Sequence, residues 1–348
     1  MGKIPSETDR EAHPDNRIGA VPPRTREWRN GEVVAEGFPV ADLRDRLGRK
    51  GAVVWLDLCA PEHRDLHVIA DELDLDPVAV EDAVSAHERA KLDRYRDYLF
   101  LNLYVPEVDG GGDLVMHEVS AFVTQQALVT VRQDRGFDVD ELIRRWDDSP
   151  ELAWLQDSPL SAAPLLYGLL DLVVDRQLAA VQDLDDEADD IEEMVFDDRS
   201  SVKEMQRRSF RLRKNLVALR RVSLPMREVL NTLMRRDVPL VAEPMVPYFQ
   251  DVYDHTLRVA EWTDGLRDLI ANLLDTRIAM QSNRLNEVMK KVTSWAAIIA
   301  VPTAVTGFYG QNVPYPGSGQ TWGFYVSTAI VVLCSIGLYS LFKARDWL

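Results

Sequence analysis

Two long apolar runs occupy the C-terminal part of the chain. The first extends from Val292 to Phe308 and the second from Phe324 to Phe342, and neither contains an acidic or basic residue. A helix that crosses a bilayer needs about 20 mostly apolar residues, and both runs are close to that length. The pattern predicts a two-helix transmembrane hairpin, with a pair of buried core helices as the alternative interpretation.

The charged residues beside these runs predict the orientation of the hairpin. Basic residues precede the first run and follow the second, whereas the loop at 310–323 has no lysine or arginine. Because positively charged flanks stay on the cytoplasmic side, the N-terminal part and the tail at 343–348 are both expected in the cytoplasm. The predicted location is the inner or plasma membrane of the cell, in contact with the lipid bilayer. The flanking basic residues are Arg284, Lys290, Lys291, Lys343 and Arg345.

Residues 33–137 show patterns typical of a cytoplasmic α/β domain, because short apolar segments alternate with helical ones. A triple glycine between Asp109 and Asp113 predicts the turn of a hairpin. The preceding segment, residues 1–32, is polar and is predicted to be disordered. The expected strands are 51–58 and 98–105, and the expected helices are 61–75 and 78–92.

Helical periodicity dominates from residue 138 to the first apolar run. In the region 138–243, a predicted helix over 164–196 is very acidic at its C-terminal end. A second predicted helix, over 201–233, is basic in its first two-thirds. Opposite charges on consecutive helices favour an antiparallel hairpin. Residues 244–309 then predict one long helix that continues into the membrane, followed by the loop and the second span at 324–342. The expected fold is an α+β cytoplasmic domain, long helices and a transmembrane hairpin.

Composition excludes several classes of function. The net charge of −17 argues against binding to nucleic acid, because phosphate groups repel an acidic protein. The two cysteines, Cys59 and Cys334, are too far apart in the sequence to form a metal or redox motif. The chain also lacks the phosphate-binding loop, nucleophile elbow and zinc-protease motif of common enzymes. We therefore expect no enzymatic activity.

Four segments resemble the CorA family of divalent-cation channels. The sequence YGQN at 309–312 is similar to the YGMN signature of that family, and it follows the first apolar run as the signature does. The other similar segments are 80–103, 246–259 and 284–293. The resemblance implies a funnel-shaped homopentamer that takes up Mg²⁺ passively, with Co²⁺ or Ni²⁺ as further substrates. It also implies that cytoplasmic Mg²⁺ regulates the channel.

The resemblance assigns the selectivity filter to Gly310, Gln311 and Asn312. Neutral oxygen atoms suit this task, because Mg²⁺ gives up its waters reluctantly and carboxylates would release the ion slowly. A helix C-cap is the alternative role for Asn312. The sequence departs from the family at Gln311, which replaces methionine, and in the outer loop, which has no acidic residue.

Further pore-lining positions follow from the same resemblance. Thr303 matches a pore-facing hydroxyl, and Asn286, Met289 and Val292 match the polar ring and apolar constriction at the cytoplasmic end. The spacing of the last three is compatible with one helix face. Ordinary helix packing is the alternative for Met289 and Val292.

The resemblance places regulatory Mg²⁺ between Asp82 of one subunit and Asp251 of the next. A cation would bridge carboxylates that otherwise repel each other. The alternative is that both are ordinary surface residues. His87 and His255 are predicted not to bind metal, because neither has a ligand neighbour at metal-site spacing. Two other functions stay open from the residues alone: Zn²⁺ transport by the same fold, and a membrane-anchored scaffold that conducts nothing.

Overall fold

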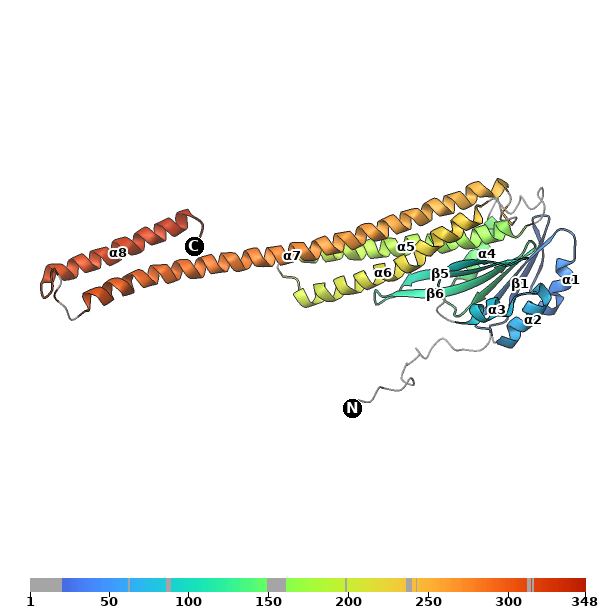
Figure 1. Cartoon of the computed structure of the whole chain (residues 1–348), viewed down its shortest axis with the longest axis horizontal. Coiled ribbons are helices and arrows are strands. Elements are labelled where there is room, and N and C mark those ends of the chain that lie inside the picture. Colours follow the sequence, from blue (N-terminus) through green and yellow to red (C-terminus); the bar gives the residue numbers. More distant parts are fainter. Residues whose placement is uncertain are drawn as a thin grey trace, which may run out of the picture. The chain divides into compact units, whose positions relative to one another are not determined.

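The computed structural model describes residues 21–61, 63–85, 89–148, 161–197, 199–235, 240–241, 243–311, 314 and 316–348. The chain divides into two compact units, Met1–Ile270 and Ala271–Leu348. The first unit contains a sheet and the helices around it, and the second contains the C-terminal apolar helices (Figure 1).

A seven-stranded sheet forms the centre of the first unit, with the strand order β2-β1-β3-β7-β6-β5-β4. Neighbouring strands are antiparallel except β3 and β7, which are parallel. The central strand β3 is buried along its whole length, as its apolar sequence AVVWLDLC predicts. The strands are β1 (Arg24–Arg29), β2 (Glu32–Glu36), β3 (Ala52–Cys59), β4 (Lys91–Arg94), β5 (Leu99–Val108), β6 (Leu114–Val123) and β7 (Ala127–Arg132).

Helices cover both faces of the sheet, so each face has its own apolar core. Alternate residues of β5 point to opposite sides: Leu101 and Leu103 pack with the long helices α5 and α6, whereas Phe100 packs with the short helices α2 and α3. The helices of this unit are α1 (Leu43–Leu47), α2 (His63–Leu73), α3 (Pro77–Val84), α4 (Val139–Asp148), α5 (Ala163–Phe196) and α6 (Val202–Leu233).

The predicted boundary at residue 32 is wrong, because Arg24–Arg29 forms strand β1 inside the sheet. Trp28 is buried and lies edge-on against Trp146 of α4, with ring centroids 5.7 Å apart. The neighbouring Glu27 is also buried and forms ion pairs with Arg29 and Arg46. The polar appearance of this segment hid the strand, since residues more distant in the sequence neutralise some of its charges: Asp147 pairs with Arg26, and Arg46 pairs with Glu27. Residues 1–20 lie outside the described residues.

The predicted helix over 78–92 is also wrong at its C-terminal end. Helix α3 stops at Val84, and Lys91–Arg94 pairs with β5 as an edge strand. The hairpin turn at Asp109–Asp113 is confirmed, because Val108 pairs with Leu114 across it.

The predicted helix hairpin is confirmed by ion pairs between α5 and α6. Arg208 on α6 lies 2.6 Å from both Glu187 and Asp190 on α5, and Arg211 lies 3.0 Å from Glu187. Ser201 begins α6, where its hydroxyl oxygen accepts a hydrogen bond from the Glu204 amide. The acidic and basic halves of the two helices therefore neutralise each other where they meet.

Helix α7 (Val246–Tyr309) begins in the first unit and ends in the second, and α8 (Thr321–Ala344) follows it. Both are long and apolar enough to cross a membrane, and almost none of their apolar segments is buried within the chain. This exposure contradicts the alternative of buried core helices. The chain reverses direction between α7 and α8, as a transmembrane hairpin requires (Figure 1).

Candidate functional site

The four predicted pore-lining residues, two polar and two apolar, form a stripe along α7. Met289 follows Asn286 by three residues, Val292 follows Met289 by three, and Thr303 lies about three helical turns beyond Val292. All four side chains are exposed, with 65% of Met289 and 59% of Val292 accessible. Because the helix is continuous, these predicted pore-lining residues lie on one side of it. Their spacing in the sequence was compatible with this arrangement but did not establish it.

Helix α7 ends at Tyr309, the first residue of the YGQN segment. The Gly310 amide donates a hydrogen bond to the Thr306 carbonyl at 2.9 Å, and the Gln311 amide donates to the Phe308 carbonyl at 3.3 Å. A Cβ atom at Gly310 would lie 3.0 Å from the Thr306 carbonyl oxygen, so the helix terminus has little room for a side chain there. Asn312 lies outside the described residues, so its role as a filter residue stays a prediction.

The threonine hydroxyls near this end are bonded to the helix itself. Thr303 donates to the Ile299 carbonyl at 2.9 Å, and Thr306 donates to the Pro302 carbonyl at 2.9 Å. Pro302 has no amide proton, but the helix continues through it. Because each hydroxyl proton is used internally, the oxygen lone pairs are the groups left to face a cation or its water shell.

The two predicted regulatory aspartates differ in their surroundings. Asp82 on α3 accepts a hydrogen bond from the Lys91 ammonium at 2.6 Å, whereas Asp251 on α7 is exposed. The expected bridge joins Asp82 of one subunit to Asp251 of the next, so it would form only in the assembled protein. Their joint role as a Mg²⁺ site stays a prediction.

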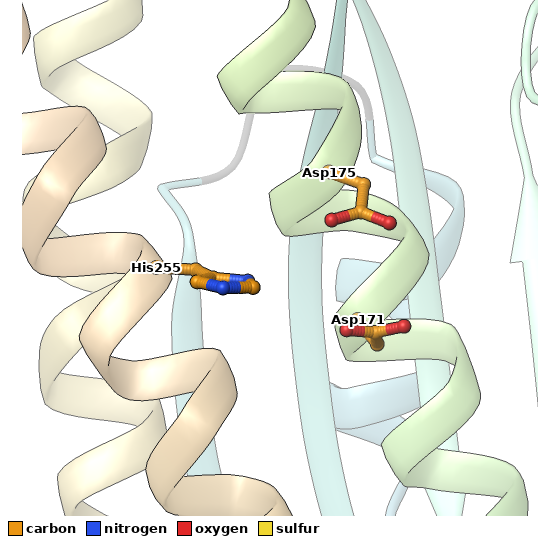
Figure 2. A group of neighbouring side chains, drawn as sticks. All are labelled: Asp171, Asp175 and His255. Carbon is orange, nitrogen blue, oxygen red and sulfur yellow. The ribbon is translucent and has the colours of Figure 1, made fainter.

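The structure brings together a different group of metal-ligating residues in the first unit. Asp171 and Asp175 lie one turn apart on α5 and face His255 of α7 (Figure 2). One ligand atom from each residue lies within 4.8 Å of the other two. The Nδ1 atom of His255 is buried and makes no hydrogen bond with the described residues.

Arg145 of α4 already neutralises part of this group. Its guanidinium donates to Asp171 at 2.6 Å and to Asp175 at 2.7 Å. Burial and the nearby Asp175 nevertheless raise the pKa of Asp171, and Arg145 only partly opposes this. Asp251, one turn before His255 on α7, adds to the negative potential at Asp171. A divalent cation here would relieve the repulsion between the carboxylates, and two carboxylates with an imidazole are suitable ligands.

Comparison with known proteins identifies the family of this chain. The model of the family described as "CorA-like Mg2+ transporter protein" matches residues 50–344. The chain is 31% identical over 297 residues to the cobalt/magnesium transport protein CorA of Thermotoga maritima, covering 84% of this chain and 83% of that protein. The chain belongs to the CorA family.

A solved CorA structure has the same fold as this chain. The complete structure of the CorA magnesium transporter from Methanocaldococcus jannaschii matches with a TM-score of 0.75 and covers 95% of this chain and all of that one. At 19% identity the match establishes the fold only. The zinc transport protein ZntB of Yersinia enterocolitica is also similar, at 21% identity over 66% of this chain and 68% of that protein.

The structure gives His255 two carboxylate neighbours, Asp171 and Asp175, which its spacing in the sequence did not predict. His87 lies outside the described residues. The signal in the sequence was the spacing of Asp171 and Asp175, which puts both carboxylates on one face of a helix. The histidine could not be added from the sequence, because only the packing of α7 beside α5 makes it their neighbour.

Proposed function

We propose that this protein is a Mg²⁺ channel, with Co²⁺ or Ni²⁺ as further substrates, that mediates passive cation uptake through a homopentamer. The observation that carries this proposal is the row of exposed side chains on α7, from Asn286 to Thr303, on a helix long enough to cross a membrane. Supporting it, the T. maritima relative is named as a cobalt/magnesium transport protein.

The geometry of the stripe suits a hydrated ion. In a symmetric assembly each stripe residue becomes a ring around the axis, since two spans per chain cannot enclose a pathway alone. Asn286, Thr303 and the YGQN segment would offer neutral oxygen atoms, while Met289 and Val292 would form an apolar constriction. Neutral oxygens hold the waters of Mg²⁺ by hydrogen bonds and let the ion leave.

Regulation by cytoplasmic Mg²⁺ is the second part of the proposal. Asp82 and Asp251 are proposed to bridge the ion between subunits, and the cluster of Asp171, Asp175 and His255 lies near Asp251 along α7. Binding that occurs only in the closed state would shift the protein toward closure as Mg²⁺ accumulates.

The decisive experiment is ion-resolved flux into proteoliposomes, with the internal Mg²⁺ concentration varied. We expect Mg²⁺ to enter without an energy source and the rate to fall as internal Mg²⁺ rises. A parallel measurement with Zn²⁺ separates this function from zinc transport. A protein that inserts correctly but moves none of these cations would be a scaffold, and the proposal would be rejected.

A further inference from the structure

An arginine-lined cavity lies in the first unit and shares no residue with the cluster of Asp171, Asp175 and His255. Its volume is about 620 Å³, and residues of α6 form much of its wall. Successive turns of α6 present Arg213, Val217, Arg221 and Leu224 to the same side. The arginines that line the cavity are Arg89, Arg213, Arg220, Arg221 and Arg267.

Most of this positive charge has no ion-pair partner among the residues that the structure describes. Asp264 pairs with two of the arginines, because its Oδ1 atom lies 2.8 Å from both Arg220 and Arg267. Arg89, Arg213 and Arg221 form no ion pair with any described residue. Five arginines and one aspartate leave an excess of four positive charges, in a chain whose net charge is −17.

The type of residue narrows the chemistry of the ligand. All five cations are arginines. The planar guanidinium of arginine can donate two parallel hydrogen bonds to one phosphate group, and the ammonium of lysine cannot. The salt bridges to Asp264 hold Arg220 and Arg267 in place. The remaining wall is apolar or aromatic, with Val217, Pro225 and Tyr104. A volume near 620 Å³ is within the range of small-molecule sites.

We propose that this cavity binds a polyphosphate anion, either a nucleoside triphosphate or inorganic polyphosphate. The arginines would bind the phosphate chain, and the apolar wall would cover the nucleoside where one is present. This site is independent of the proposed transport, because it uses none of the residues assigned to the pore or to the carboxylate clusters.

Binding can be measured by calorimetry on the full-length protein in detergent, with ATP and inorganic tripolyphosphate as separate probes. EDTA keeps divalent cations from the carboxylates. The test variant is the double substitution Arg213→Ala and Arg221→Ala, which removes two exposed side chains. The control is Lys203→Ala with Arg227→Ala, since these are also exposed on α6 but do not line the cavity.

We expect the parent and the control to bind at least one of the probes. The test variant should bind that probe with an affinity at least about tenfold lower. This factor corresponds to about 1.4 kcal/mol. Tighter binding of ATP would identify the nucleotide as the ligand, and equal binding would identify inorganic polyphosphate.

Three results would overturn the proposal. The first is that the parent binds neither probe. The second is that test and control variants weaken binding equally, since this would indicate a diffuse effect of charge. The third is that the test variant keeps its affinity but loses its oligomeric state, because the arginines would then bind carboxylates of a second copy.

Discussion

The Lys91 ammonium lies 2.6 Å from the Asp82 carboxylate, so one proposed ligand of regulatory Mg²⁺ already has a cationic partner within its own chain. Lys91 also lies 3.2 Å from Asp93. Burial lowers the pKa of Lys91, but its hydrogen bonds to Asp82 and Asp93 outweigh burial, so the pKa is raised. Lys91 therefore stays charged at neutral pH and competes with any cation for Asp82.

Replacing Lys91 with methionine should make the protein respond to less Mg²⁺. The ion pair is partly exposed, and such pairs contribute about 0.2–1 kcal/mol, so the midpoint concentration should fall by about 1.4-fold to fivefold. The measurement is protection of the full-length protein from a protease as Mg²⁺ increases. Lys203→Met is the control, because Lys203 is exposed on α6, far along the sequence from Lys91. An unchanged midpoint would mean that Asp82 does not bind the ion.

The double variant Asp82→Asn, Asp251→Asn should lose Mg²⁺-dependent protection altogether. If the closed state alone binds the ion, each site contributes about 1.4 kcal/mol at ten times its Kd. Five such sites in a pentamer would contribute about 7 kcal/mol, which is enough to shift a two-state population almost completely. Protection of the double variant over the same Mg²⁺ range as the parent would place the sensor elsewhere.

Asn312→Ala should abolish Mg²⁺ uptake in proteoliposomes and leave the oligomeric state unchanged. The reason is that the amide oxygen is proposed to bind the hydrated ion at the end of α7, where charge is absent from the neighbouring sequence. Gln320→Ala in the same loop is the matched control, since it removes an amide outside the motif. Uptake by Asn312→Ala at the parent rate would leave Asn312 with the role of a helix cap.

His255→Ala should weaken Co²⁺ binding more than Mg²⁺ binding. An imidazole nitrogen suits Co²⁺, whereas Mg²⁺ prefers oxygen ligands, and the carboxylates of Asp171 and Asp175 remain in the variant. We expect about a tenfold loss of Co²⁺ affinity by calorimetry, which is about 1.4 kcal/mol. His67→Ala, at an exposed position of α2, is the control. Equal Co²⁺ affinity in both variants would exclude His255 as a ligand.

The pair of His117 and Asp134 should make stability depend on pH. Nδ1 of His117 lies 2.9 Å from Asp134, and this hydrogen bond raises the pKa of His117 above 6.5 although burial opposes it. Burial raises the pKa of Asp134, but the hydrogen bonds from His117 and the Gly136 amide outweigh this and lower it below 3.8. The histidine contribution is therefore complete below its unfolded pKa and is lost as pH rises through the folded pKa. The aspartate contribution is lost only in acid, as pH falls through its folded pKa.

His117→Gln should consequently cost more stability at about pH 6 than at about pH 9, because the parent has lost the charged pair at the higher pH. Urea unfolding of the full-length protein in detergent at both pH values gives the two free-energy differences. If the substitution changed the free energy of unfolding equally at both pH values, its effect would come from packing. The charged pair would then contribute nothing to stability.

Two glycine substitutions in helices should have opposite effects. A Cβ atom on Gly168 of α5 would lie 2.6 Å from Nε1 of the buried Trp146, so Gly168→Ala should destabilise the protein by about 1–3 kcal/mol. A Cβ atom on Gly265 of α7 would have no neighbour within 4 Å, so Gly265→Ala should stabilise it by up to about 1 kcal/mol. Thermal unfolding measures both. A stabilising Gly168→Ala would mean that Trp146 can move aside.

The sequence by itself predicted the elements whose signal is local. The sequence alone indicates that Val292–Phe308 and Phe324–Phe342 are candidate membrane spans, because length and absence of charge are properties of a single segment. The long helices α5 and α6 and their hairpin followed in the same way from periodicity and from opposite charge. The strand β1 was not predicted, because residues elsewhere in the chain neutralise its charges: Asp147 pairs with Arg26, and Arg46 pairs with Glu27.

Only the tertiary structure decided which distant residues share a site. His255 joins Asp171 and Asp175 because α7 lies beside α5, and five arginines from three segments of the chain line one cavity. A motif spacing reports neighbours along a helix or turn, within a few residues. Contacts between elements depend on which faces are buried together, and this is determined by the packing of the whole chain.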